Sequence, residues 1–300
     1  MEKVRLSDNL EISRFVHGMW RLTEWNLSER ELLKFIENVI DLGVNTFDHA
    51  DIYGNYSCEQ LFGNAISLNI SIRDKIKIIT KCGIKLMSDK FPERKIKYYD
   101  YSSSYIIDSV ENSIRNLNVE HIDLLLLHRP APFFNPEEVA KAFSQLKLSG
   151  KVSNFGVSNF NIIQFEMLNK YVDEKLVTNQ VEISPYCLEH FENGNMDFFL
   201  KESIPPMAWS PMAGGKILTP KDEKGEKLYL VIKEIAEELN VNNLDQIVFN
   251  WLLKHPASIV PVLGTGKIQH VKSALNALDF EMSLEQWYRI YIAGLGKKLP

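Results

Sequence analysis

The sequence predicts one (β/α)8 barrel that begins with a β-hairpin. Short apolar runs alternate with amphipathic helical patterns along the 300 residues, and the segment IDLLLL at residues 122–127 is apolar on both faces. Such strands are typical of a parallel sheet covered by helices. The dinucleotide fingerprint GxGxxG follows none of the strands; Gly264-Thr265-Gly266 comes nearest, after the last one. These observations favour the barrel over a doubly wound open sheet, and without a low-complexity linker residues 1–300 read as one domain.

The elements follow in order from the hydrophobic periodicity and its punctuation. Residues 3–14 have the pattern of a hairpin, and an apolar run directly after it supplies the first strand. A helix is predicted over 28–42, because Ser28 with Glu31 forms a capping box. The remaining strands are predicted at 44–47, 75–80, 122–127, 152–157, 177–181, 206–209 and 258–262, and the helices at 57–68, 103–117, 136–148, 161–171, 195–202, 225–239, 243–254 and in the tail 282–300. The stretch between the strand at 75–80 and its helix is predicted to be a charged loop rich in tyrosine.

Composition excludes several classes of function. A net charge of −5 and a pI near 5.9 disfavour binding to nucleic acid or to an anionic membrane. The three cysteines contain no CxxC pair, which disfavours a disulfide framework or a zinc site. The chain start lacks an apolar targeting segment, and no apolar run is long enough to span a bilayer. We therefore expect a cytoplasmic monomer or weak oligomer that acts on a small molecule.

Ionisable residues gather where the predicted strands end. Asp48, Lys81 and His128 each follow or close a strand, and Tyr53 lies in the loop that follows Asp48. In a barrel these ends share one face, so a buried Lys81 would take Asp48 as its partner. A cation beside Tyr53 would lower the pKa of the phenol and make it a proton donor, and His128 would hydrogen-bond a substrate oxygen.

Each of these residues also has a structural explanation. A polar group at a strand end often serves stability alone, and Tyr53 taken singly reads as a packed loop tyrosine. Ser158 and Asn159 are equally compatible with an N-cap for the helix at 161–171, and Gln180 with a residue inside the barrel. The joint occurrence of these residues at successive strand ends favours the functional reading.

Several motifs together resemble the aldo-keto reductase family, in particular its bacterial oxidoreductases with a His-Arg-Pro sequence. The resemblance runs from about residue 10 to 278. The motifs are TFDHADIYG at 46–54, ITKCG at 79–83, LLLHRP at 125–130, GVSNF at 156–160, NQVEISPY at 179–186 and AWSPM at 208–212. The resemblance implies hydride transfer from NADPH to an aldehyde or ketone without a metal. Tyr53 would be the general acid, Lys81 the cation that tunes it, Asp48 the partner of Lys81 and His128 the residue that orients the carbonyl.

The resemblance also implies a cofactor site. Ser158, Asn159 and Gln180 would hold the carboxamide, Trp209 would stack on the nicotinamide, and residues 210–216 would cross the pyrophosphate. The positions expected to contact NADPH are Gly18, Met19, Trp20, Asp48, Ser158, Asn159, Gln180, Trp209, Ser210, Pro211, Met212, Gly214, Lys216, Gly264, Thr265, Lys267 and His270.

The sequence departs from the family at the adenosine end of this site. Where the family commonly has an arginine and an asparagine, the chain has His270 and Ala274. Lys267, Thr265 and Lys272 are the candidates to replace them. We expect NADPH to be preferred, with NADH as a possible substitute.

Two other classes of function compete with a carbonyl reductase. One is a nicotinamide-binding sensor with the same fold and little turnover, and the other is a metal-dependent barrel hydrolase. A complete set of Asp48, Tyr53, Lys81 and His128 favours the enzyme. Trp20, Trp25, Tyr56, Phe133 and Phe134 are predicted to surround an apolar mouth that accepts varied carbonyl compounds.

Overall fold

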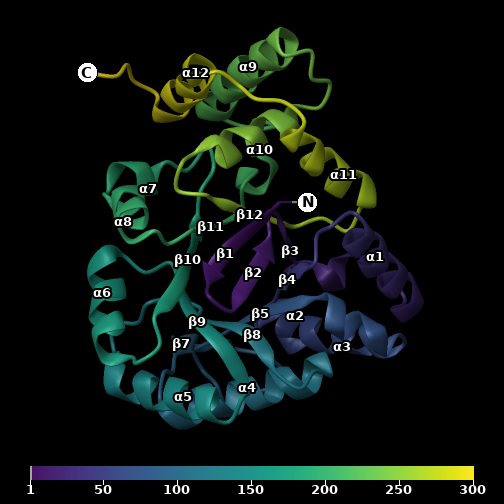
Figure 1. Cartoon of the computed structure of the whole chain (residues 1–300), viewed down its shortest axis with the longest axis vertical. Helices are drawn as coiled ribbons and strands as arrows, with labels where there is room; N and C mark the ends of the chain where they lie inside the picture. Colours follow the sequence, from purple (N-terminus) through teal and green to yellow (C-terminus); the bar gives the residue numbers. More distant parts are fainter. Residues whose placement is uncertain (1) are drawn as a thin grey trace. The chain divides into compact units, whose positions relative to one another are not determined.

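The computed structural model describes residues 2–300, in which eight parallel strands form a closed barrel (Figure 1). The strands follow one another around the barrel in chain order, except that β6 and β7 form a separate pair. The predicted (β/α)8 barrel with an N-terminal hairpin is confirmed. The barrel strands are β3 Val16–Gly18, β4 Thr46–Asp48, β5 Lys77–Cys82, β8 Ile122–Leu127, β9 Val152–Ser158, β10 Leu176–Glu182, β11 Met207–Trp209 and β12 Val260–Leu263.

The contacts divide the chain into two compact units, and the boundary between Asn179 and Gln180 falls inside β10. In the first unit, α1, α3, α4, α5 and α6 each pack on the next and cover the outer side of the strands (Figure 1). Besides its strands, this unit contains the hairpin β1 Lys3–Ser7 and β2 Leu10–Ser13, the short ladder β6 Ile84–Lys85 and β7 Tyr98–Tyr99, the 3-10 turns η1 Leu22–Glu24 and η2 Ile70–Lys75, and the helices α1 Glu29–Asp41, α2 Tyr53–Tyr56, α3 Cys58–Ser67, α4 Ser103–Leu117, α5 Pro136–Leu148 and α6 Ile162–Tyr171.

In the second unit, the tail contains the helix α12 Leu284–Leu295, as its apolar spacing predicts. This helix packs on α9. A tryptophan pair reinforces this region, because the Trp251 and Trp287 rings stack with centroids 5.0 Å apart. Each indole N–H donates to the other residue's backbone oxygen, at 3.1 and 3.0 Å. The helices and 3-10 turns of this unit are α7 Glu189–Glu192, α8 Asn195–Glu202, η3 Ala213–Gly215, α9 Glu223–Glu238, α10 Leu244–Lys254, α11 Ile268–Leu275, η4 Asn276–Leu278 and α12 Leu284–Leu295.

Helix caps fix where several helices begin. Ser28 caps α1 in a full capping box with Glu31, and Asn161 caps α6 in the same way with Gln164. Asn161 is thus the N-cap of α6, which removes the alternative explanation of Ser158 and Asn159 as its cap. One correction concerns the predicted charged loop after β5, because it contains the two-residue strands β6 and β7. Strands this short leave no periodic signal in a sequence.

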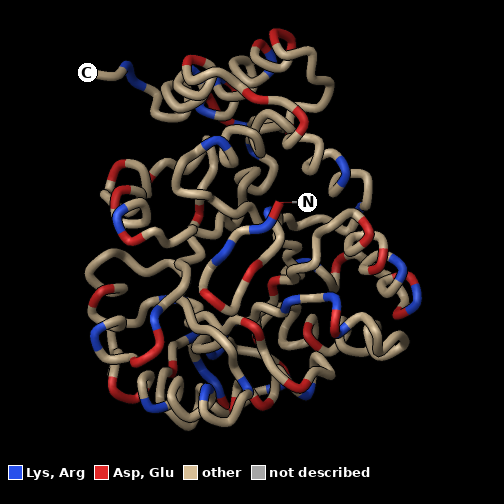
Figure 2. Tube along the Cα trace, viewed as in Figure 1, with Lys and Arg blue, Asp and Glu red and all other residues tan. Residues whose placement is uncertain are grey.

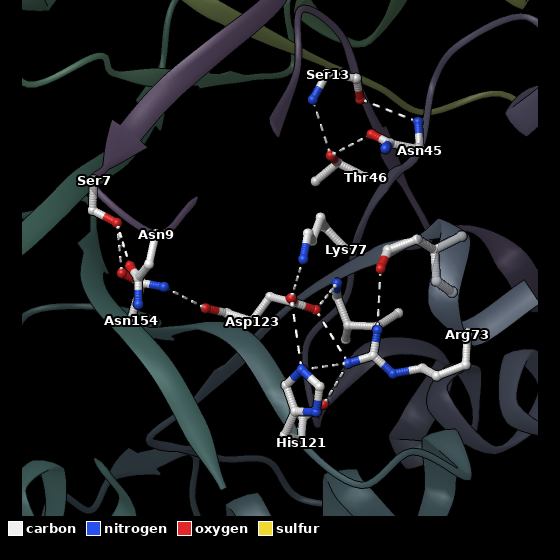
Figure 3. A network of polar contacts seen from close by, with 12 residues as sticks. Ser7, Asn9, Ser13, Asn45, Thr46, Arg73, Lys77, His121, Asp123 and Asn154 are labelled. Carbon is white, nitrogen blue, oxygen red and sulfur yellow. Dashed lines mark hydrogen bonds and ion pairs between the residues drawn. The ribbon is translucent and has the colours of Figure 1, made fainter. Parts of the chain in front are cut away.

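A polar network around the buried side chains of Asp123 and Asn154 lies at the amino-terminal ends of β5, β8 and β9 (Figure 3). Asp123 accepts hydrogen bonds from Lys77 Nζ at 3.0 Å and from Arg73 Nη2 at 3.3 Å. Asn154 donates to the backbone oxygen of Asp123 and accepts from Ser7 Oγ of the hairpin at 2.8 Å. Residues at this end of a barrel serve stability, which leaves the opposite strand ends for chemistry.

Charges of both signs are interspersed on the outer helices of each unit (Figure 2). On α9, for example, Lys227 pairs with Glu223 and Lys233 with Glu237 at i,i+4 spacing. Within residues 2–300, no helix combines the length and the apolar character needed to cross a membrane.

Candidate active site

Three strands of the first unit present ionisable side chains at their carboxyl ends. Asp48 is the last residue of β4, Lys81 is next to last in β5, and His128 directly follows β8. These strands are parallel neighbours, with Asp48 opposite Ile79 and Lys81 opposite Leu126. Parallel neighbours end on the same face, and the structure therefore brings these side chains together.

Lys81 is the centre of the cluster. Its side chain is 1% exposed, and Nζ donates to both carboxylate oxygens of Asp48, at 2.8 and 2.7 Å. The same nitrogen donates to the backbone oxygen of His49 at 2.8 Å and lies 3.1 Å from Tyr53 Oη. The buried ammonium is thus surrounded by oxygen acceptors, which is the condition for keeping a charge inside a protein.

The protonation of Lys81 is set by two opposing effects. Burial lowers its pKa, but Asp48 and Tyr53 together outweigh burial and hold the pKa above its ordinary value. Lys81 therefore remains charged at neutral pH.

The pKa of Tyr53 corrects the sequence-based expectation. Burial raises it, Lys81 lowers it and Asp48 raises it, and the net direction is upward. The phenol therefore keeps its proton at neutral pH. The charge of Lys81 opposes the effect of burial and favours the phenolate form.

His128 packs against Tyr53. The two ring centroids are 5.8 Å apart and the rings meet edge to face. His128 is 9% exposed, and its pKa lies well below the ordinary value because of burial and the charges of Lys81, Arg129 and Lys97. A neutral imidazole beside a protonated phenol can hydrogen-bond one carbonyl oxygen while the phenol donates to it.

Two further strand-end residues of the first unit connect to His128. Asn159 has a positive φ of 62°, and its side-chain nitrogen donates to Ser158 Oγ at 2.7 Å and to the His128 backbone oxygen at 3.3 Å. Asparagine adopts this left-handed conformation more readily than most residues, and here it allows the side-chain amide to reach both acceptors. Ser158 is 1% exposed at the end of β9.

The predicted residues Gly18, Met19 and Trp20 lie at the end of β3. The Met19 backbone N–H donates to the Asp48 backbone oxygen at 2.9 Å. Met19 is buried, as is the adjoining Gly18, whereas Trp20 is exposed under the guanidinium of Arg21, 5.3 Å from its ring centroid.

The predicted mouth residues differ in exposure. Phe133 is 95% exposed, whereas Phe134 packs on Phe160 and on Tyr101, with centroids 6.0 and 5.4 Å apart. Trp25 is half-buried and packs on His17 and Phe35. The prediction of an aromatic mouth therefore applies to fewer of these residues than the sequence indicates.

The second unit holds the remaining predicted residues, within β10 and in the segments that follow β11 and β12. Gln180 is buried in the middle of β10, with Nε2 directed to the sulfur of Met207 at 4.0 Å. Trp209 ends β11 and is half-buried. It is followed by positive φ values at Ser210 and at residues 213–215. Gly214 is exposed and has open space where a Cβ would stand. Pro211 is buried, Met212 is half-buried, and Lys216 lies 5.0 Å from the Tyr186 ring centroid.

The predicted adenosine residues lie directly before α11 and within it. Thr265 Oγ1 lies 3.1 Å from His270 Nδ1 and accepts from the Lys267 backbone N–H at 3.2 Å. At Gly264 no heavy atom lies within 4 Å of the place that a Cβ would occupy, so the backbone is accessible there. Ala274 is 1% exposed and points into the core, and its side chain is therefore not available to a ligand.

Sequence reasoning missed the buried carboxyl group of Glu59 in α3. Glu59 is 2% exposed and accepts from Thr80 Oγ1 at 2.6 Å. Burial raises the pKa of Glu59 and, more strongly, that of Asp51. The available signal was the place of Glu59 at i−3 and i−7 from Phe62 and Ile66, on the buried face of α3. Across residues 2–300, no three His, Cys, Asp or Glu side chains are grouped so that they could hold a metal ion.

Comparison with known proteins places these features in context. The model of the Aldo/keto reductase family matches residues 14–293. The chain is 47% identical to the uncharacterized oxidoreductase YcsN of Bacillus subtilis (strain 168), over all of both chains. It is 38% identical to the 6-dehydroglucose reductase of Agrobacterium fabrum (strain C58 / ATCC 33970), again over all of both chains.

A solved structure shares the fold. The thermostable aldo-keto reductase crystallised with the inhibitor epalrestat superimposes with a TM-score of 0.81. The sequences are 24% identical, and the match covers 98% of this chain and 100% of the other.

Proposed function

Because the chain belongs to the aldo-keto reductase family, we propose that it reduces an aldehyde or ketone to an alcohol with NADPH, and that Tyr53 is the general acid. The observation that carries this proposal is the contact of Lys81 Nζ with Asp48 at 2.7 Å and with Tyr53 Oη at 3.1 Å. A binding protein has no need to keep a cation beside a protonated phenol.

The residues of the first unit have distinct tasks in this proposal. NADPH, when bound, supplies the hydride. Tyr53 Oη gives its proton to the carbonyl oxygen, and Lys81 stabilises the resulting phenolate. Neutral His128 donates a hydrogen bond to the same oxygen and sets its direction, and Ser158 with Asn159 holds the carboxamide of the cofactor.

The chemistry of the second unit suits a dinucleotide. The exposed backbone at Gly214 and the cation of Lys216 suit a pyrophosphate, and the half-buried ring of Trp209 suits stacking on nicotinamide. Thr265, Lys267 and His270 would bind the adenosine 2′-phosphate, so we propose NADPH as the preferred cofactor over NADH.

The test combines binding and turnover. The purified protein is titrated with NADPH and with NADH while tryptophan fluorescence is followed, and aldehydes, ketones and quinones are then added. A glucose-derived aldehyde belongs in the panel because of the activity for which the Agrobacterium fabrum relative is named. Carbonyl-dependent oxidation of NADPH supports the proposal. Tight binding without turnover favours the sensor function, and absence of binding refutes both.

A further inference from the structure

The segment after Tyr53 is held in an uncommon backbone conformation. Gly54, Asn55 and Tyr56 have successive positive φ values of 57°, 55° and 63°. A tyrosine rarely takes this conformation, which persists only where the surrounding structure imposes it. Ser57 N–H donates back to the Tyr53 backbone oxygen at 3.0 Å, so a shift of this run moves Tyr53 as well.

The segment between β5 and α4, residues 83–102, supplies the contacts that hold Tyr56; we call it the excursion. Tyr56 Oη accepts from Arg94 Nη1 at 2.8 Å and from the Leu86 backbone N–H at 2.9 Å. Lys90 Nζ donates to the Tyr56 backbone oxygen at 2.9 Å and to Ser57 Oγ at 2.8 Å. Both the ring end and the backbone end of Tyr56 are therefore fixed from this excursion.

Arg94 is built into this contact rather than lying on the surface. Its side chain is 10% exposed, and the guanidinium carbon lies 3.6 Å from the Phe91 ring centroid. The Phe91 ring in turn packs edge to face on Tyr56, with centroids 4.9 Å apart. A planar cation stacked on one ring and hydrogen-bonded to the next has little freedom to move.

We propose that Arg94 is a positioning residue for Tyr53: with Tyr56 and Lys90 it holds the strained run 54–56 and so fixes Tyr53 Oη beside Lys81. This inference rests on the proposed role of Tyr53 as the acid. Arg94 touches neither Lys81 nor the proton itself; it acts through Tyr56. Because a misplacement of about 1 Å costs about 100-fold in rate, a relaxed run lowers kcat strongly.

The test compares Arg94→Met with Arg94→Lys and with Arg73→Met. Arg73 is a matched control, since it is a partly buried arginine with hydrogen bonds to Asp123 and His121 at the other end of the strands. In Arg94→Met we expect kcat to fall about 10- to 100-fold, with the NADPH dissociation constant within about 2-fold of the original. Arg94→Lys, which keeps the charge over Phe91, should recover part of kcat. Arg73→Met should lower the melting temperature and leave kcat unchanged.

Two readouts separate positioning from loss of stability. If Tyr53 moves away from Lys81, the alkaline limb of the kcat profile shifts to higher pH, because Lys81 no longer lowers the pKa of the phenol. Hydrogen exchange of the amides at 53–57 should also accelerate in Arg94→Met, and this measurement needs no turnover. Unchanged exchange, or an unchanged kcat and pH limb, overturns the proposal. If the unmutated protein reduces no carbonyl compound, the proposed function is refuted. Faster exchange in Arg94→Met would then still support the role of Arg94 in ordering residues 53–57.

Discussion

Removing the charge of Lys81 should destabilise the protein, and removing the charge of Asp48 as well should restore part of the loss. Both side chains are almost fully buried, at 1% and 3% exposure, and Lys81 contacts both carboxylate oxygens. Breaking such a pair from one side costs about 3–5 kcal/mol, because the other charge stays buried without its counter-ion. We therefore expect Lys81→Met to lower the free energy of unfolding by about that amount.

A double-mutant cycle measures this coupling. The free energy of unfolding is determined by urea denaturation for Lys81→Met, Asp48→Asn and the double variant. The double variant should be more stable than Lys81→Met and still inactive. Lys85→Met with Asp100→Asn is the control, since that pair is more exposed, at 17% and 24%, and should show a smaller coupling. Additive losses at Lys81 and Asp48 would contradict our explanation of the site.

Two further predictions concern pH and the cofactor. The pKa of buried His49 is about 3, against about 6.5 for an unfolded histidine, so protonation favours unfolding. Stability should fall by about 1.4 kcal/mol per pH unit between about pH 6.5 and 3 on account of this group, and His49→Leu should reduce that slope in urea titrations at several pH values. Lys267→Ala should raise the NADPH dissociation constant about 10-fold and leave that of NADH unchanged; an equal effect on both would exclude a 2′-phosphate contact.

The parts of the fold that could be predicted are those with strong local signals. The strand 122–127 and the helix 136–148 have the same bounds in the sequence prediction and in β8 and α5. A run that is apolar apart from Asp123 defines the first, and Asn135 followed by Pro136 marks the start of the second. The ladder of β6 with β7 was missed because its partners are two residues long and lie 12 residues or more apart.

The residues of the site could be predicted from the sequence, but the direction of their pKa shifts could not. Asp48, Lys81 and His128 could be found from their places after apolar strands. The direction of the Tyr53 pKa could not, because it depends on how fully the phenol is buried. Arg94 gave no signal either, since its contact with Tyr56 spans 38 residues and depends on how the excursion folds back.

The proton donor is the central claim, and Tyr53→Phe tests it most directly. The variant keeps the ring and removes the hydroxyl that lies 3.1 Å from Lys81 Nζ. Steady-state reduction of a reactive aldehyde should be nearly abolished, while fluorescence titration gives the NADPH affinity of the original protein. Turnover comparable to the original would show that the proton comes from another group.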